Sequence, residues 1–303
     1  MAGRRLRAAT RGSALARWQT EHVAALLRAA DPAVEVEAVV VTTEGDRRRD
    51  VPIEAIGGRG VFAKEVQAAV LEGRADFAVH SAKDLPSSPE LQPGGLVLAC
   101  VPERADPRDA LVGDRLDDLP SGAVVATGSV RRRAQLGHAR PDLEFAGLRG
   151  NIETRLARAP AFGAIVMAYA ALVRLGRAGA AAEVIEPSLL LPQVGQGALA
   201  VECRAGDEEA WERLAAIEHA RSRRCVDAER AWLAAIGGGC DLPVGALAEV
   251  DAGGDLRLEA VVASPDGTTL VREAATGHDP ASLGARLAGV LLDERGARAI
   301  LGR

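Results

Sequence analysis

Lysine and aromatic residues are scarce in this 303-residue chain. Aromatic residues make up 3% of it, so its hydrophobic cores must be packed mainly with alanine, valine and leucine. Of the 37 basic residues only Lys64 and Lys83 are lysines, and the others are arginines. A GC-rich coding sequence accounts for this bias. Against such a background, each lysine that is present is a candidate for a specific role.

Other absences narrow the class of protein. The net charge of -5 and the pI of about 5.7 argue against a nucleic-acid or anionic-membrane partner. No stretch approaches the roughly 20 apolar residues of a membrane span, and no apolar segment follows the arginines of residues 1–10 to make a signal peptide. The four cysteines form no CxxC pair. We therefore expect a cytoplasmic protein with reduced thiols.

The length of the chain and the order of its elements predict more than one domain. Strands are expected at residues 4–10, 34–43, 77–81, 96–101, 123–127, 143–148 and 164–168, and helices at 13–30, 62–72, 130–137 and from 152. A polar, proline-containing segment at residues 102–120 separates the two series. This alternation favours parallel, doubly wound α/β sheets, whose ligands bind at the carboxyl ends of strands.

The last third of the chain has a different order of elements. Helices are expected at residues 207–217 and 222–236, strands at 244–250, 256–263 and 269–275, and a closing helix at 281–301. Grouping of helices and strands in this way predicts an α+β domain.

Two serines, Ser13 and Ser129, stand where a predicted strand gives way to a predicted helix, in the sequences ATRGS and ATGS. Serine at such a position is commonly an N-cap. The N-terminus of a helix also offers free N–H groups and the positive end of a dipole to an anion. The repeated turn therefore allows two interpretations, helix capping alone or a pair of anion sites in two similar halves that hold one acidic ligand.

Arginines gather near the second of these turns. Residues 127–155 hold six arginines and three acidic residues, although the whole chain is acidic. A solvated basic helix face is the plain interpretation, and a set of forked donors for carboxylates or phosphates is the functional one. The chain has no GxxxxGK[ST] motif and no GxGxxG motif that opens a helix after a strand, so carboxylates are as plausible as phosphates.

The segment VHSAKDLP, residues 79–86, lies at the expected carboxyl end of a buried strand and contains Lys83 beside Asp84. A surface ion pair in a turn is the plain interpretation of these two residues. His80 has no second ligand at a suitable spacing, so we expect a hydrogen-bonded structural histidine and no metal site.

A cysteine in the segment GGGC, Cys240, follows three glycines between a predicted helix and a predicted strand. A thiol on such an open loop differs from the usual buried cysteine, and an accessible thiolate can form a covalent bond. The loop alone leaves a reactive and an ordinary cysteine equally open.

Taken together, these segments resemble the porphobilinogen deaminase family. The resemblance covers nearly the whole chain and rests on nine segments in the same order: ATRGSALARWQ, TEGD, GGRGVFAKE, AVHSAKDLP, ERADPRDALV, ATGSVRRRAQL, LRGNIETRL, LPQVGQGALAVECR and GGGCDLPVGA. It implies two α/β domains similar to type II periplasmic binding proteins and a C-terminal α+β domain that carries the cysteine. Domain 1 would be residues 1–99 with 198–217, domain 2 residues 100–197, and domain 3 residues 218–303.

The resemblance also implies an activity. The enzyme would condense four molecules of porphobilinogen, with loss of ammonia, into the linear tetrapyrrole hydroxymethylbilane in porphyrin and haem biosynthesis. A dipyrromethane cofactor, linked through a thioether to Cys240, would prime the chain. The family further implies a monomer with no nucleic-acid or membrane partner.

The residues that match the family's site are carried over by position. Asp84 matches the catalytic aspartate, which stabilises an electron-poor azafulvene and relays protons. The cofactor would be bound by Cys240, Lys83, Ser129, Arg131, Arg132 and Asp84. The substrate and its acids would contact Arg11, Ser13, Phe62, Ser81, Thr127, Arg149, Arg155, Arg174 and Gln196.

Three positions depart from the family's common pattern. Arg59 stands where a lysine is frequent, Gly128 replaces a frequent serine, and Glu44 stands where an arginine is frequent. Arginine keeps the charge of lysine at position 59 but differs from it in donor geometry.

A non-catalytic anion-binding protein of the periplasmic type is the main alternative function, because it also uses two α/β lobes. It gives no role to Cys240 or Asp84. A nucleic-acid-binding function would cite the arginines at 47–49 and 131–133, but the acidic net charge and the few aromatic residues weigh against it.

Overall fold

The computed structural model describes residues 5–43, 63–238 and 242–302. The chain divides into two compact units, each built from two stretches of sequence. Unit 1 contains Met1–Arg104 and Ala198–Arg223, and unit 2 contains Ala105–Gly197 and Arg224–Arg303. Unit 2 thus includes most residues of the second and third domains expected from the sequence, and the three-domain boundaries remain a prediction.

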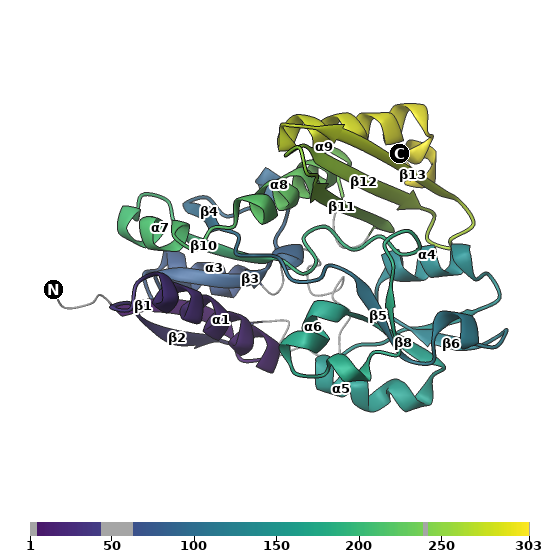
Figure 1. The fold of residues 1–303 in the computed structure, drawn as a ribbon, viewed down its shortest axis with the longest axis horizontal. Coiled ribbons are helices and arrows are strands. Elements are labelled where there is room, and N and C mark those ends of the chain that lie inside the picture. The colour runs from purple at the N-terminus through teal and green to yellow at the C-terminus, as the bar shows by residue number, and fades with distance from the viewer. Residues whose placement is uncertain (1–4, 44–62, 239–241, 303) are drawn as a thin grey trace. The chain divides into compact units, whose positions relative to one another are not determined.

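Unit 1 is built on a five-stranded sheet in the order β2-β1-β3-β10-β4 (Figure 1). Its strands are β1 (Arg5–Arg11), β2 (Glu35–Val41), β3 (Phe77–Ser81), β4 (Leu96–Cys100) and β10 (Leu199–Arg204). Strands β1, β2 and β3 are parallel, whereas β10 runs antiparallel to both of its neighbours. Apolar side chains of α1 (Ala14–Ala30) and α7 (Glu208–Ala215) pack on one face of the sheet, and those of α3 (Lys64–Leu71) on the other.

Unit 2 repeats this design with a sheet in the order β7-β6-β8-β5-β9. Its strands are β5 (Asp109–Gly113), β6 (Val124–Ala126), β7 (Glu144–Ala146), β8 (Ala164–Ala168) and β9 (Glu183–Ile185). Here β5 is the strand that runs antiparallel to its neighbours. Helix α4 (Val130–Ala139) covers one face, while α5 (Ile152–Arg158) and α6 (Tyr169–Arg174) cover the other.

The predicted fold class, two α/β sheets followed by an α+β region, is confirmed, but the expectation of parallel sheets throughout is wrong. Each sheet contains one antiparallel strand, and β5 lies inside residues 102–120, which the sequence suggested were a polar connection. Strand β5 begins with a charged residue, Asp109, that is fully buried. Because this residue is charged, the sequence pattern did not predict a buried strand here.

The C-terminal part of unit 2 is an antiparallel sheet of β11 (Val244–Val250), β12 (Leu256–Ala263) and β13 (Leu270–Gly277). It packs against α9 (Pro280–Gly289) and against the part of α8 (Ala220–Ala235) that belongs to unit 2, with Trp232 fully buried between them. Gly284 allows the close approach of these helices, since a Cβ there would lie 2.5 Å from the backbone nitrogen of Trp232.

The closing helix expected at residues 281–301 is interrupted. Helix α9 continues as a π-helical turn, Val290–Glu294, and a short helix, α10 (Ala297–Ile300), follows it. Gly296 has a φ of +76°, a left-handed conformation that ends the first helix. Within the described part of the chain, we find no helix long and apolar enough to cross a membrane.

Candidate functional site

In unit 1 the carboxyl end of β1 leads directly into α1. Ser13 is the N-cap of this helix, and its Oγ accepts a hydrogen bond of 3.3 Å from the backbone N–H of Ala16. The capping interpretation of this serine is therefore confirmed. Arg11, the last residue of β1, is partly buried beside it in the chain.

The carboxyl end of β3 carries the second group of polar side chains in unit 1. After Ser81 the chain forms one 3-10 turn, Ala82–Asp84, in which Lys83 and Asp84 are both partly exposed. Gln19 of α1, a buried residue, donates a hydrogen bond of 2.8 Å from Nε2 to Ser81 Oγ. The turn that carries Lys83 and Asp84 is thus connected to α1 by the hydrogen bond between Gln19 and Ser81.

A buried group of ionisable and amide side chains lies within the sheet of unit 1. The Nε2 atom of His80 is 3.1 Å from Oε2 of Glu202, and Gln67 donates to the same oxygen at 2.8 Å. All three residues are less than a tenth exposed. His80 is therefore a buried residue beside a carboxylate, but among the described residues its Nε2 makes no hydrogen bond, so the expected hydrogen bond is not found at this atom. Among the residues described here, no group of three or more His, Cys, Asp or Glu side chains is arranged to hold a metal ion.

In unit 2 the corresponding strand end, that of β6, leads into α4. Ser129 is the N-cap of α4, and its Oγ accepts a hydrogen bond of 3.4 Å from the N–H of Arg132. Thr127 Oγ1 accepts a hydrogen bond of 3.1 Å from the N–H of Ser129. Both predicted anion turns are thus helix caps, which satisfy only part of the N–H groups at each helix start.

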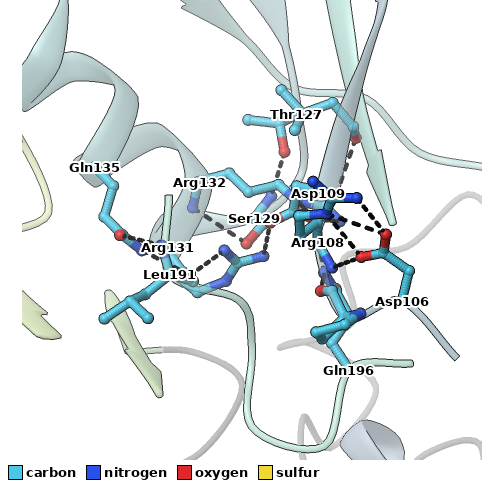
Figure 2. Close-up of polar contacts among 12 residues, drawn as sticks. Asp106, Arg108, Asp109, Thr127, Ser129, Arg131, Arg132, Gln135, Leu191 and Gln196 are labelled. Carbon is cyan, nitrogen blue, oxygen red and sulfur yellow. Dashed lines mark hydrogen bonds and ion pairs between the residues drawn. The ribbon is translucent and has the colours of Figure 1, made fainter. Parts of the chain in front are cut away.

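The first turn of α4 carries the most prominent electrostatic feature of unit 2 (Figure 2). Arg131 and Arg132 are 3% and 6% exposed, and their guanidinium groups meet the fully buried carboxylate of Asp109 on β5. Arg131 Nη2 is 2.8 Å from Asp109 Oδ2, and Arg132 Nη2 is 2.7 Å from Oδ1. We call these three residues the arginine cluster.

The charges of the arginine cluster decide the ionisation of Asp109. Burial alone would raise the pKa of its carboxyl group, but the charges of Arg131 and Arg132, together with hydrogen bonds from Arg132 and Gln196, outweigh burial and lower the pKa to about 2. Burial lowers the pKa of Arg131, and the charge of Asp109 opposes this change. Arginine starts from so high a pKa that the Arg131 guanidinium group stays charged at neutral pH.

The two segments that enter and leave the first part of unit 2 run beside each other at this cluster. The N–H of Ala105 donates to the carbonyl of Gly197 at 3.2 Å. Gln196, fully buried, donates from Nε2 to Asp109 Oδ1 at 2.9 Å and to the carbonyl of Pro107 at 2.8 Å. Gly197, with φ +85°, leaves no room for a Cβ, which would lie 2.5 Å from Ala105 O.

Three further arginines expected to bind acids lie elsewhere in unit 2. Arg174 at the end of α6 donates from Nη2 to Gly197 O at 2.7 Å, and burial lowers its pKa to about 10. Arg149 is exposed. Arg155 is partly exposed and donates from Nε to the carbonyl of Gly150 at 2.8 Å. Arg174 is thus bound to Gly197, the residue after Gln196, whose side chain donates to Asp109 of the arginine cluster.

Several expected site residues lie outside the described part of the chain, namely Phe62, Cys240, Arg59 and Glu44. Gly128, which is described, is exposed, and a Cβ there would lie 2.9 Å from the carbonyl oxygen of Leu148. The glycine at position 128 therefore allows a close approach to the backbone at Leu148, which the Cβ of a serine would obstruct.

Sequence reasoning missed at least four polar residues of these groups, namely Gln19, Gln67, Glu202 and Asp109. Asp109 stands in the segment ERADPRDALV, one of the nine that carry the resemblance. A physical signal was nevertheless available. Two adjacent arginines that are to be buried require an anion nearby, because an unpaired buried charge is costly.

Comparison with known proteins places the chain among relatives that align over nearly all of it. Residues 6–212 match the family model "Porphobilinogen deaminase, dipyromethane cofactor binding domain", and residues 223–293 match "Porphobilinogen deaminase, C-terminal domain". A porphobilinogen deaminase of Acidothermus cellulolyticus is 50% identical over 95% of this chain and 88% of that protein. Those of Roseiflexus sp. and Bacillus velezensis are 48% and 42% identical over 96% and 98% of this chain and 97% and 96% of theirs.

Solved structures also align with the chain, at lower similarity. The L-cystine solute receptor of Neisseria gonorrhoeae shares 14% identity over 70% of this chain and 85% of that chain, with a TM-score of 0.39. A likeness at this level carries no argument about function.

Proposed function

Because the chain belongs to the porphobilinogen deaminase family, we propose that it condenses four molecules of porphobilinogen into hydroxymethylbilane, with loss of ammonia. It is an enzyme of the transferase type in porphyrin biosynthesis. The match of two family models to residues 6–212 and 223–293 is the observation that carries this function. We further propose that it acts in the cytoplasm as a monomer.

The residues of unit 2 fit a ligand that carries several carboxylates, as dipyrromethane does. Two guanidinium groups and one carboxylate leave the arginine cluster with one positive charge in excess. Among the described residues, the Nε–H of Arg131 is buried and has no hydrogen-bond partner. The cluster therefore has both charge and a donor for one acid group. When bound, the cofactor supplies the pyrrole to which the first substrate is joined.

Cys240 is the residue we propose for attachment of the cofactor. Gly245 on β11, five residues after Cys240 in the sequence, packs against the arginine cluster. A Cβ at Gly245 would lie 3.3 Å from Cδ of Arg131 and 2.8 Å from Leu191 O. Leu191 O in turn accepts a hydrogen bond of 2.6 Å from Arg131 Nη1. The short separation of Cys240 and Gly245 along the sequence supports attachment at Cys240 of a cofactor that Arg131 binds.

In unit 1 we propose that Asp84 is the catalytic residue. Loss of ammonia from porphobilinogen leaves an azafulvene whose positive charge extends to the pyrrole nitrogen. A fixed carboxylate stabilises such a cation and accepts or relays the proton released when the new carbon–carbon bond forms. The partly exposed position of Asp84 after β3 supports this role, since the carboxylate can meet a ligand.

The remaining side chains are proposed to bind the acetate and propionate groups of the substrate and of the growing chain. In unit 1 these are Lys83, Arg11, Ser13 and Ser81, and in unit 2 they are Thr127, Ser129, Arg149, Arg155, Arg174 and Gln196. Phe62, outside the described residues, is proposed to contact the pyrroles. Permanent cations suit this task because each added substrate brings two more carboxylates.

The intact mass of the purified, unfolded protein tests the proposal, with a Cys240→Ser variant as its control. We expect an excess mass of two condensed pyrrole units in the unmodified chain and none in the variant. If the excess is absent, the protein is incubated with porphobilinogen and measured again. Failure to form an adduct or to release hydroxymethylbilane then would contradict the proposed enzyme and return the choice to a non-catalytic anion-binding protein.

A further inference from the structure

The side chains of Arg131 and Arg132 would not converge without a common partner. Adjacent residues of a helix point in directions about 100° apart and do not face each other. In unit 2 both guanidinium groups nevertheless reach the carboxylate of Asp109 (Figure 2). This carboxylate belongs to Asp109, the first residue of β5, and is fully buried.

Each guanidinium group is held at a second point as well. Arg132 donates to Asp109 Oδ1 from Nε at 3.0 Å and from Nη2 at 2.7 Å, and its Nη1 donates to Val166 O at 3.0 Å. Arg131 donates from Nη1 to Leu191 O at 2.6 Å. Gln135 fixes Leu191 in turn, because its side chain bonds both the N–H and the carbonyl of that residue.

The contact between Arg131 and Asp109 is an ion pair without hydrogen-bond geometry. Asp109 Oδ2 and Arg131 Nε are both buried and lack a hydrogen bond in the described structure. Arg132 and Gln196, by contrast, satisfy Oδ1 with three N–H donors. Asp109 therefore holds Arg132 firmly and balances Arg131 by charge, leaving a donor of Arg131 unused.

We propose that Asp109 is a positioning residue that fixes Arg131 and Arg132 and leaves them the capacity for one ligand carboxylate. The inference rests on the proposed function, in which these arginines bind the cofactor. Without Asp109 the cluster would carry two unbalanced buried charges, which repel each other. With it, one positive charge remains, so a single carboxylate completes the balance. Gln196 steadies Oδ1 without adding charge.

A purely structural ion pair would contribute stability alone, so the test needs a readout of ligand capacity. The variants are Asp109→Asn, which keeps the shape of the side chain, and Asp109→Ala, which leaves room for a formate ion. The control is Asp106→Asn. Asp106 is partly exposed and pairs with Arg108 on the same segment, and among the described residues its side chain forms no ion pair with the arginine cluster.

Each apoprotein is incubated with porphobilinogen, and the fraction of chains that gain the mass of two pyrrole units is followed with time. The thermal midpoint of each apoprotein is measured with and without formate. We expect loading to slow at least tenfold, on the order of one charged hydrogen bond, in both Asp109 variants and less than twofold in Asp106→Asn. Formate should raise both the loading rate and the thermal midpoint of Asp109→Ala alone.

Loading of Asp109→Asn at the unmodified rate would overturn the proposal, as would an Asp109→Ala variant that stays folded and does not respond to formate. A slow Asp109→Ala beside a normal Asp109→Asn would show that packing, not charge, is what Asp109 supplies, and would also overturn it. Failure of the unmodified apoprotein to load would instead contradict the proposed function. The formate-dependent thermal midpoint of Asp109→Ala would still test the positioning role in that case.

Discussion

The two α/β sheets have the same strand plan and treat charge in opposite ways. Each has three parallel strands, an antiparallel fourth strand and a fifth strand beyond it. In both, the antiparallel strand carries a buried carboxylate, Glu202 on β10 and Asp109 on β5. The partners of the two carboxylates differ in kind.

Glu202 is paired with a histidine and a glutamine, His80 and Gln67. Asp109 is paired with two permanent cations and a glutamine. A glutamine carries no charge and a histidine carries no permanent one, whereas each arginine is a permanent cation. The partners of Glu202 therefore bring no permanent positive charge into the sheet of unit 1. The two arginines that pair with Asp109 leave one positive charge in excess in unit 2.

The strand ends differ in the same sense. In unit 1 the turn after β3 presents Lys83 and Asp84, both partly exposed. In unit 2 the charged groups next to β6 are buried and fixed by hydrogen bonds. The same strand plan thus carries a partly exposed carboxylate in unit 1 and a rigid set of buried cations in unit 2, which supports the proposed proton transfer by the first and the proposed ligand binding by the second.

The comparison is tested most severely at Asp84. We expect Asp84→Ala to retain its cofactor mass and to lose turnover by roughly 10²- to 10⁴-fold, the usual contribution of a positioned acid–base or electrostatic group. Turnover is measured as hydroxymethylbilane released, and cofactor content as intact mass. Glu90→Ala serves as the control, since Glu90 is an exposed carboxylate on the following segment of unit 1. Undiminished turnover in Asp84→Ala would remove the accessible carboxylate from the mechanism.

A smaller effect is expected at the exposed arginines of unit 2. Arg149→Leu should lower the rate of elongation about 10- to 100-fold, because one charged hydrogen bond contributes about 1.5–3 kcal/mol. Mass spectra should then show intermediate masses accumulating between one and four added pyrroles. Arg158→Leu, an exposed arginine at the end of α5, should leave the distribution unchanged. Identical distributions for both variants would show that Arg149 does not bind the growing chain.

Much of this fold could be predicted because its central strands are continuous apolar runs. Strands β3 and β8 were expected at the residues where they occur, since both are buried on two faces. The sequence pattern did not predict β5, because this strand begins with the charged residue Asp109. It predicted one continuous closing helix, although the helix is interrupted at Gly296. A sequence shows the residue type of Asp109 but not the two cations that make its burial possible.

In the candidate site too, local features could be predicted from the sequence, whereas contacts that depend on the tertiary structure could not. Local features such as the caps Ser13 and Ser129 follow from neighbouring residues and were visible in the sequence. The arginine cluster joins residues more than 20 positions apart, on β5 and α4, and only the folded sheet brings them together. Charge balance in a core is a tertiary property, so residue patterns alone did not reveal it.

Acid unfolding tests whether the cations of unit 2 act on Asp109 as described. Its pKa is lowered to about 2 in the folded chain, so its contribution is fully present above about pH 4 and is lost as the pH falls toward 2. The stability difference between the unmodified chain and Asp109→Asn should therefore shrink by about 2 kcal/mol between about pH 5 and pH 2. Denaturant titrations at several pH values measure it. A difference that does not vary over this range would show that Asp109 is not held ionised by Arg131 and Arg132.

The smallest expected effect concerns the two caps, which are chemically alike in the two units. Ser13→Ala and Ser129→Ala each remove one hydrogen bond to a helix N–H, and each should lower the free energy of unfolding by about 0.5–2 kcal/mol. Ser13→Gly and Ser129→Gly are the controls, because glycine at an N-cap costs only a few tenths of a kcal/mol. The stability change should be similar in both units, whereas cofactor loading should slow only in Ser129→Ala, since Ser129 begins the helix that carries the arginine cluster. Equal loading by the two alanine variants would limit both serines to capping, and the contrast between the units would then rest on their charged residues alone.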